Sequence, residues 1–332
     1  MARPPPTVWV LTDPLPGHAN QALGVAEALG WPFTVKPLSY GPLAGLPNGL
    51  LGDRTWGLTA AARVALTGPW PDLVIAAGRR AAPLARWLKR QKADLLLAHL
   101  MWPGSARAFD LIAVPEHDRV ADRPGLIRTV GSPNRVTPAR LTAAAARLAP
   151  QLSGLPRPRI ACLVGGARRA ARFTPRDAAL LAQRASAYAK LHGGSLLVTT
   201  SRRTGAACED SLARSLEAPH LVHRWTMSDD NPYLGILGSA DALIVTADSA
   251  SMCSEACATG RPVFVYRKHS AGPDKLACLH KRLEQLGYLR PLGAPWPTSM
   301  PPWLDPASTV AAAIRSLVAS SSAWGGRSEV LG

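Results

Sequence analysis

The chain has 332 residues, 47% of them hydrophobic, which is enough for two domains of ordinary size. Its formal net charge of +16 is compatible with nucleic acid, anionic lipid or a phosphorylated ligand as partner. The arginines are scattered, without a Lys/Arg run and without the interleaved aromatic residues that single-strand binders use. The composition therefore argues against nucleic acid and leaves the other two classes open.

The five cysteines have an irregular spacing that does not indicate a disulfide framework. Cys253 and Cys257 are one helical turn apart and precede Cys278 and His280, so a zinc site is one interpretation. Small buried side chains are the other, and the lack of a Cys-x-x-Cys pair favours it. No Asp-x-Asp pair is present either, so we expect no bound metal.

The first residues lead directly into a strand-like segment, and no apolar run approaches the roughly 20 residues of a membrane span. We therefore expect a cytoplasmic protein in a reducing compartment. Residues 43–72 are apolar and contain Trp56 and Trp70. They predict either buried helices and turns or a surface that rests on anionic membrane, in which case the protein is peripheral at the inner face.

Strand-like and helix-like segments alternate along the whole chain. Strands are expected at 7–12, 32–38, 72–78, 94–100, 109–115, 125–131, 159–166, 195–201, 220–225, 241–247 and 261–267. Helices are expected from Asn20, at 81–90 and 140–152, from Thr174, and at 231–239, 250–259 and 274–287. This alternation predicts an α/β protein with parallel, helix-covered sheets.

A Gly/Pro turn after the helix that starts near residue 140 divides the pattern into two similar halves. We expect two facing, doubly wound Rossmann-like domains, residues 1–150 and 151–318, followed by a flexible tail at 319–332. Ligands of open parallel sheets bind beyond the carboxyl ends of the strands, so the residues after each strand are the candidates for chemistry.

In the first half, Asp13 ends a strand, and Gly17 and His18 begin the next helix. Amide groups at a helix start attract anions, and glycine permits close approach. His18 is a candidate base because an imidazole titrates near pH 6.5, and Asp13 is the second candidate. The alternative is ordinary loop structure, with His18 bonded to backbone and Asp13 in a turn before proline.

In the second half, Gly165 and Gly166 end a strand and precede an arginine-rich linker that contains Arg168. Thr200, Ser201 and Arg202 follow the next strand. Glycines, hydroxyls and guanidinium groups can bind a phosphate or a sugar, but the same residues also form tight turns and helix caps.

The segment 246–266, TADSASMCSEACATGRPVFVY, carries the most specific pattern. Thr246, Ser249 and Ser251 surround a helix start, where the helix dipole favours a phosphate. Glu255 lies about one and a half turns further on, and one carboxylate can accept both hydroxyls of a ribose. The alternative for Glu255 is a solvated helix residue, which its apolar neighbours disfavour.

The segments LVGGARR, VTTSRRTG and NPYLGILGSADALIVTADSASMCSEACATGRPVFVY resemble the donor domain of GT-B glycosyltransferases. Together with TDPLPGHANQALGVAEAL, AAGRRAAPLA and FDLIAVPEHDRV, they resemble more closely the bacterial members of the mitochondrial-fission "elongated mitochondria" family, nearly from end to end. Two departures are the Asp-Pro at residues 13–14, where the family pattern usually has Asp-Gly, and the Ala-Arg-Arg that follows the two glycines.

The resemblance implies a GT-B-like fold that binds a nucleotide sugar in the cleft between its domains, with no further cofactor. In the second half it implies a diphosphate at Gly165 and Gly166, phosphate contacts at Ser249 and Ser251, and a ribose at Glu255. In the first half it implies an acceptor beside Gly17 and His18. The apolar segment 43–72 and the basic charge favour a lipid-linked or anionic glycan as this acceptor.

The reaction implied is metal-independent transfer with inversion, because the Glu-x7-Glu pattern of many retaining GT-B enzymes is absent after Glu255. His18 or Asp13 would then act as base. Two alternatives stay open. One is a nucleotide-sugar epimerase or hydrolase on the same fold. The other is a non-catalytic adaptor, as in the plant relatives that recruit a dynamin-related protein.

Overall fold

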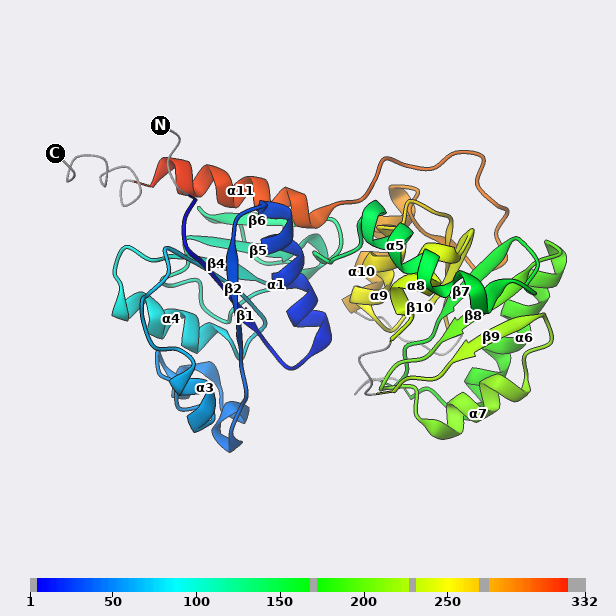
Figure 1. Ribbon diagram of the computed structural model, residues 1–332, viewed down its shortest axis with the longest axis horizontal. Coiled ribbons are helices and arrows are strands. Elements are labelled where there is room, and N and C mark those ends of the chain that lie inside the picture. The colour runs from blue at the N-terminus through cyan, green and yellow to red at the C-terminus, as the bar shows by residue number, and fades with distance from the viewer. Residues whose placement is uncertain (1–4, 168–171, 227–230, 269–274, 322–332) are drawn as a thin grey trace. The chain divides into compact units, whose positions relative to one another are not determined.

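The computed structural model describes residues 5–167, 172–226, 231–268 and 275–321 (Figure 1). The chain divides into two compact units, one formed by Met1–Arg135 with Asp305–Gly332 and the other by Val136–Leu304. Each contains a six-stranded parallel sheet with helices on its faces. The predicted α/β class with two Rossmann-like, GT-B-type sheets is therefore confirmed.

The first sheet has the strand order β2-β1-β3-β4-β5-β6, and every pairing in it is parallel. Its strands are β1 (Val8–Thr12), β2 (Phe33–Pro37), β3 (Leu73–Ala77), β4 (Leu96–Leu100), β5 (Leu111–Pro115) and β6 (Leu126–Thr129). All six lie within the segments that the sequence predicts. The apolar central strands are buried on both faces, which explains why they read as continuous apolar runs rather than as alternating patterns.

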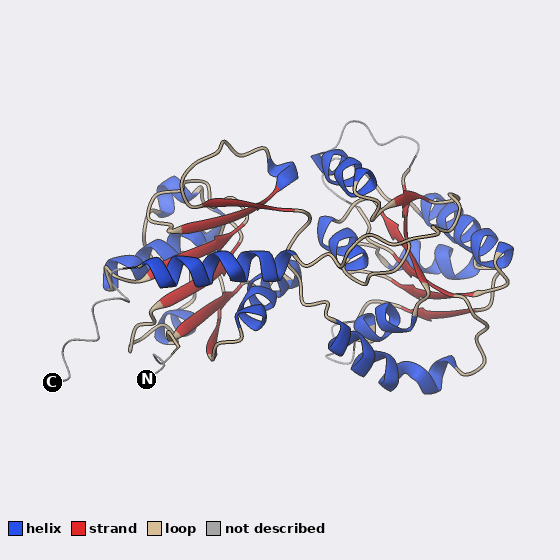
Figure 2. Cartoon of the chain, turned by 90° about the horizontal axis from the view of Figure 1, so that it is seen from above, coloured by secondary structure: helices blue, strands red, loops and turns tan. Residues whose placement is uncertain are grey.

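Helices cover both faces of this sheet (Figure 2). Val8 and Val10 of β1 point to the face covered by α1 (Pro16–Leu29) and α11 (Pro306–Ser320), and the intervening side chains point to α4 (Ala82–Gln91). The shorter elements are η1 (Pro42–Gly45), α2 (Asn48–Leu51), α3 (Ala60–Val64) and η2 (Glu116–Asp118).

The second sheet has the order β12-β11-β10-β7-β8-β9 and is parallel throughout. Its strands are β7 (Arg159–Leu163), β8 (Ser195–Thr199), β9 (His220–His223), β10 (Ala242–Thr246), β11 (Val263–Tyr266) and the short β12 (Arg290–Pro291). Its helices are α5 (Pro138–Leu148), η3 (Ala149–Leu152), α6 (Pro175–Leu191), α7 (Ala206–Arg214), α8 (Tyr233–Ser239), α9 (Ala250–Cys257) and α10 (Lys275–Gln285). The longest, α6, begins with a capping box between Thr174 and Asp177, as its Thr-Pro start predicts.

The units divide at residue 135, not at the predicted residue 150. Helix α5 packs on α8. The two helices approach so closely at Gly238 that a Cβ there would lie only 2.3 Å from the carbonyl oxygen of Leu141. Helix α11 packs along α1 of the first unit, where Arg315 donates to the carbonyl oxygen of Leu29 at 3.2 Å. The predicted tail begins inside α11, and residues 322–332 lie outside the described residues.

Both sheets reverse their strand order at one place. In the first sheet the reversal lies between β1 and β3, and in the second between β7 and β10. At such a point the loops after the two neighbouring strands leave in opposite directions, so a crevice forms at the carboxyl edge where ligands of open α/β sheets bind. The loops after β1, β3, β7 and β10 are therefore the first places to look for function.

Candidate functional site

In the first unit, a buried carboxylate lies directly after β1. One oxygen of Asp13, Oδ1, accepts hydrogen bonds from the Leu15 amide and from the Arg80 guanidinium, both at 2.8 Å. The other oxygen, Oδ2, lies 3.5 Å from Nδ1 of His18. The two candidate bases predicted from the sequence are thus neighbours.

His18 stands on the first turn of α1, one residue after Gly17, and its ring lies against the loop that follows β3. A Cβ on Gly78, the first residue of that loop, would lie 2.5 Å from Nδ1 of His18. Gly78 also has a φ of +83°, which side chains rarely adopt. Glycine at this position therefore makes room for the imidazole beside Asp13.

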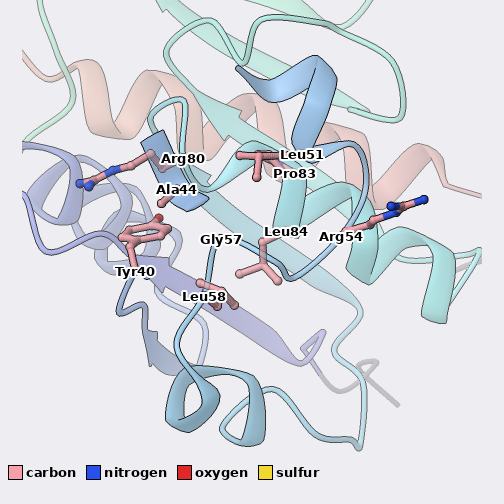
Figure 3. Close-up of a pocket in the computed structure, with 9 residues that line it drawn as sticks. All are labelled: Tyr40, Ala44, Leu51, Arg54, Gly57, Leu58, Arg80, Pro83 and Leu84. Atoms are coloured by element: carbon pink, nitrogen blue, oxygen red, sulfur yellow. The ribbon is translucent and has the colours of Figure 1, made fainter. Parts of the chain in front are cut away.

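Tyr40 and Arg80 complete this cluster. The Arg80 guanidinium stacks over the Tyr40 ring at 4.4 Å, and burial together with the nearby Asp13 carboxylate raises the pKa of the Tyr40 hydroxyl. Both residues also line a small pocket against α4 (Figure 3). The other lining residues are Ala44, Leu51, Arg54, Gly57, Leu58, Pro83 and Leu84.

The electrostatics keep Asp13 ionised. Burial alone would raise its pKa, but the neighbouring His18 imidazole, the Leu15 amide and the Arg80 guanidinium hold the pKa of this carboxyl below its usual range. Among the described residues, Asp13 Oδ2, His18 Nδ1 and the Tyr40 hydroxyl are buried without a hydrogen-bond partner within normal distance. Buried polar atoms usually have partners, so these three mark a place that a polar ligand or water can complete.

In the second unit, three loops meet at the carboxyl edge of the sheet. The Gly165 amide, after β7, donates to Oγ1 of Thr246 at the end of β10 at 2.8 Å. The Ser201 hydroxyl, after β8, donates to the carbonyl oxygen of Gly165 at 2.8 Å. Three of the predicted site residues therefore lie in one hydrogen-bonded cluster.

Asp248 is the charged centre of this cluster. Its Oδ2 accepts a hydrogen bond from the Gly166 amide at 2.9 Å and pairs with Arg203 at 2.8 Å. A Cβ on Gly165 would lie 2.2 Å from the same oxygen, and one on Gly166 would lie 2.1 Å from the Arg203 carbonyl oxygen. Both glycines are therefore required by contacts inside the protein.

Helix α9 carries the other predicted residues of this unit. Ser249 is its N-cap and accepts from the Met252 amide at 3.3 Å, and Ser251 is half-buried in the first turn. Glu255 is only 8% exposed and accepts a hydrogen bond from the Tyr233 hydroxyl at 2.7 Å. Burial and the Glu255 carboxylate raise the pKa of Tyr233 well above its ordinary value.

The remaining predicted residues differ in placement. Thr200 is buried, donates to Glu209 at 2.5 Å and accepts from the Trp225 amide at 2.8 Å. Arg202 is exposed, whereas its neighbour Arg203 pairs with Asp248. Arg168 lies outside the described residues.

The cysteines are free and almost all buried. Cys253 Sγ lies 3.6 Å from Nε2 of His280, and burial raises the pKa of this thiol to about 12. Within the described ranges, no three His, Cys, Asp or Glu side chains are grouped so that they could hold a metal ion.

A model of the family described as mitochondrial fission ELM1 matches residues 16–318. The chain belongs to this family. It is 28% identical over 284 residues to the mitochondrial fission protein ELM1 of Arabidopsis thaliana, a match covering 76% of this chain and 64% of that protein. It is 27% identical over 294 residues to an uncharacterized protein, RP120, of Rickettsia prowazekii, covering 78% of this chain and 82% of that protein.

Solved structures share the fold of this ELM1-family chain at low sequence identity. The UDP-GlcNAc 2-epimerase of Methanocaldococcus jannaschii aligns with a TM-score of 0.56 and 12% identity, over 95% of this chain and 99% of that chain. A glycotransferase of kitacinnamycin aligns with a TM-score of 0.51 and 15% identity, over 98% and 94%. These likenesses show that the fold is that of GT-B glycosyltransferases and epimerases.

Five residues of the two clusters were not among the predicted site residues. Asp248, Arg80 and Arg203 stand two to four residues after strands, so taking every polar residue of the loops after the strands would have included all three. Tyr233 lies in the Asn-Pro-Tyr motif that the sequence comparison used. Tyr40 has no sequence signal, because it is 27 positions from Asp13 and belongs to an irregular segment.

Asp13→Asn should lower the free energy of unfolding near pH 7 by about 1–3 kcal/mol, because it weakens charge-assisted hydrogen bonds to a buried group. The folded-state pKa of Asp13 is depressed, so its stabilisation exists above the unfolded value near 3.9 and is lost as pH falls through the folded pKa. Denaturant titrations of both proteins between pH 7 and pH 3 should therefore converge at the acid end.

Asp122→Asn is the matched control, because Asp122 pairs with Arg128 while its side chain is 89% exposed. It should change stability little at any pH. A stability difference between wild type and Asp13→Asn that does not vary with pH would contradict an ionised, stabilising Asp13.

Proposed function

We propose that this ELM1-family protein is a glycosyltransferase that holds a nucleotide sugar at the carboxyl edge of its second sheet and activates an acceptor hydroxyl with His18 in its first unit. The observation that carries the proposal is the coincidence of polar clusters with strand-order reversals. The Asp13 cluster lies at the β1/β3 reversal and the Gly165 cluster at the β7/β10 reversal. Both are the crevice positions at which α/β sheets bind ligands.

The second cluster supplies groups suited to a nucleotide sugar. The first turn of α9 offers the positive end of a helix dipole, and Arg203 offers a guanidinium. Glu255 is buried and accepts a hydrogen bond from Tyr233, so its carboxylate is held in place, and a carboxylate can accept from ribose hydroxyls. These groups support binding of a sugar-bearing diphosphate without a metal ion.

The first cluster supplies a base. In the proposed mechanism, the proton stays on Nδ1 of His18, facing the Asp13 carboxylate 3.5 Å away, and this tautomer leaves Nε2 free to take a proton. An acceptor hydroxyl then attacks the anomeric carbon, its proton passes to His18, and the nucleoside diphosphate leaves with its bonding electrons, which gives inversion. Arg80 holds Asp13 in position rather than contacting substrate.

We expect the protein to bind a uridine, guanosine or cytidine diphosphate sugar, detected as a thermal shift and quantified by calorimetry. Glu255→Gln should weaken this binding about tenfold or more, because an amide replaces a charged hydrogen-bond acceptor. The control is Glu284→Gln, which changes the same charge at the partly exposed Arg267–Glu284 pair of the same unit and should leave the affinity unchanged. No shift with any of these nucleotides would favour the adaptor alternative.

His18→Ala should reduce turnover by about 10²–10⁴-fold while the affinity for the nucleotide sugar stays unchanged, because the base is lost and the second-unit cluster is intact. The measurement is release of the nucleoside diphosphate with a panel of sugar and lipid-linked acceptors, with products identified by mass spectrometry. Acceptor-dependent release indicates transfer, acceptor-independent release indicates a hydrolase, and an isomerised nucleotide sugar indicates an epimerase. Full activity in His18→Ala would refute the assigned base.

A second proposal concerns the location of the protein. No helix in the described part of the chain is long and apolar enough to cross a bilayer. However, residues 43–64 expose Leu43, Leu46, Leu50, Trp56 and Val64, of which Leu50 is 67% and Val64 71% exposed. The Arg54 guanidinium stacks over the Trp56 ring at 4.1 Å. Apolar side chains beside a cation on a basic protein support peripheral binding to anionic membrane and a lipid-linked or anionic glycan acceptor.

Vesicles of anionic lipid should sediment the protein at low salt, and vesicles of neutral lipid should do so much less. A Leu50→Ser/Trp56→Ser/Val64→Ser variant should lose most of this binding. The matched control is Leu180→Ser/Leu191→Ser, which removes exposed apolar side chains from the second unit and should bind as wild type does. Equal sedimentation with both kinds of vesicle would remove the proposal.

A further inference from the structure

The carboxylate of Asp248 already accepts from the hydrogen-bond donors that a bound phosphate would use. Its Oδ2 already accepts the Gly166 amide at 2.9 Å and already pairs with Arg203 at 2.8 Å. The Gly165 amide is likewise taken by Thr246. The loop that resembles a phosphate cradle is therefore closed on itself by side chains of its own unit.

Carboxylates and phosphates compete for the same partners, because both are anions that accept hydrogen bonds from backbone amides and guanidinium groups. A diphosphate that entered this cluster would have to share or displace these contacts. It would also approach a carboxylate whose side chain is 17% exposed and therefore only partly screened by water. Two like charges at close range repel, and the repulsion is stronger where water screens them less.

The glycines agree with this arrangement. Neither Gly165 nor Gly166 has a positive φ, so backbone conformation does not require glycine at either position. Gly165 has no room for a Cβ because Asp248 is there, at 2.2 Å from the Cβ position. Gly165 is thus required by the Asp248 carboxylate, and Gly166 by the backbone at Arg203.

We propose that Asp248 is an internal phosphate mimic that competes with the diphosphate of the nucleotide sugar and weakens its binding. This inference rests on the proposed function. Binding requires Asp248 to release the Gly166 amide and Arg203 to turn from Asp248 to the ligand. Asp248 thereby selects against ligands that offer a phosphate alone, because only a ligand that also engages Glu255 gains enough to displace it.

The test compares wild type with Asp248→Asn and Asp248→Ser by calorimetry with uridine diphosphate and guanosine diphosphate at low salt. Both variants should bind the preferred diphosphate about tenfold more tightly or better, because one negative charge is removed from the phosphate site. The gain should shrink as salt is raised. Affinity for the uncharged nucleosides should not change.

Asp241→Asn is the matched control. Asp241 immediately precedes the same strand, β10, pairs with Arg157 and accepts the Arg159 amide at 2.7 Å, so the charge change is equal but falls at the opposite edge of the sheet. Its diphosphate affinity should equal that of wild type. A rise in this control equal to that of Asp248→Asn would reduce the effect to net charge and overturn the inference.

Two failures are distinguishable. If wild type binds a diphosphate and both Asp248 variants, folded by circular dichroism, bind it equally or more weakly, the inference is wrong and the proposed function stands. If neither wild type nor either variant binds any nucleotide, the loop is no phosphate site, and both the inference and the proposed function are wrong. Two variants of different size guard against a change of shape being mistaken for a change of charge.

Discussion

The parallel pairing of β1 with β3 and of β7 with β10 is the constraint on which the rest of the structure depends. In a parallel pair the two carboxyl ends lie at the same edge, and where strand order reverses, the chains that follow diverge from it. This places the Asp13 loop beside Gly78 in one unit and the Gly165 loop beside Thr246 in the other. The central contact of each cluster, His18 against Gly78 and Gly165 with Thr246, follows from this geometry.

The two units use the same electrostatic device. A carboxylate follows a strand at each reversal, Asp13 after β1 and Asp248 after β10. Each is bound by one backbone amide and by one arginine from a loop after another strand, Arg80 in the first unit and Arg203 in the second. In the first unit, these contacts lower the pKa of the buried Asp13 carboxyl against the effect of burial. The carboxylate charge orients a histidine in the first unit, and in the second it opposes an incoming anion.

Much of this could be predicted from the sequence. The eleven predicted strands are all present, because β-branched and leucine-rich runs bounded by turn residues have few other stable arrangements when both sheet faces are buried. His18, Asp13 and Gly165 were predicted as site candidates because they stand at strand ends or helix starts, and Glu255 because it follows such a start within α9. Their partners were not predicted as such: that Asp13 faces Arg80 and Tyr40, or that Glu255 faces Tyr233, depends on segments far apart in the chain. The predicted domain boundary at residue 150 differs from the observed one at residue 135 for the same reason. The apolar pattern of a helix does not indicate which surface the helix packs on.

The sequence by itself determined the local structure, the parallel α/β class and membership of the family, because periodicity and short motifs are properties of neighbouring residues. Tertiary structure alone decided which charges meet. The space beside Gly165, which the sequence assigns to a ligand, is occupied by the Asp248 carboxylate. Helix α11 belongs to the first unit, although it follows the second unit in the chain. The physical reason is that hydrogen bonds and packing act across space between residues tens of positions apart, and strand order, which no local pattern encodes, decides which of them become neighbours.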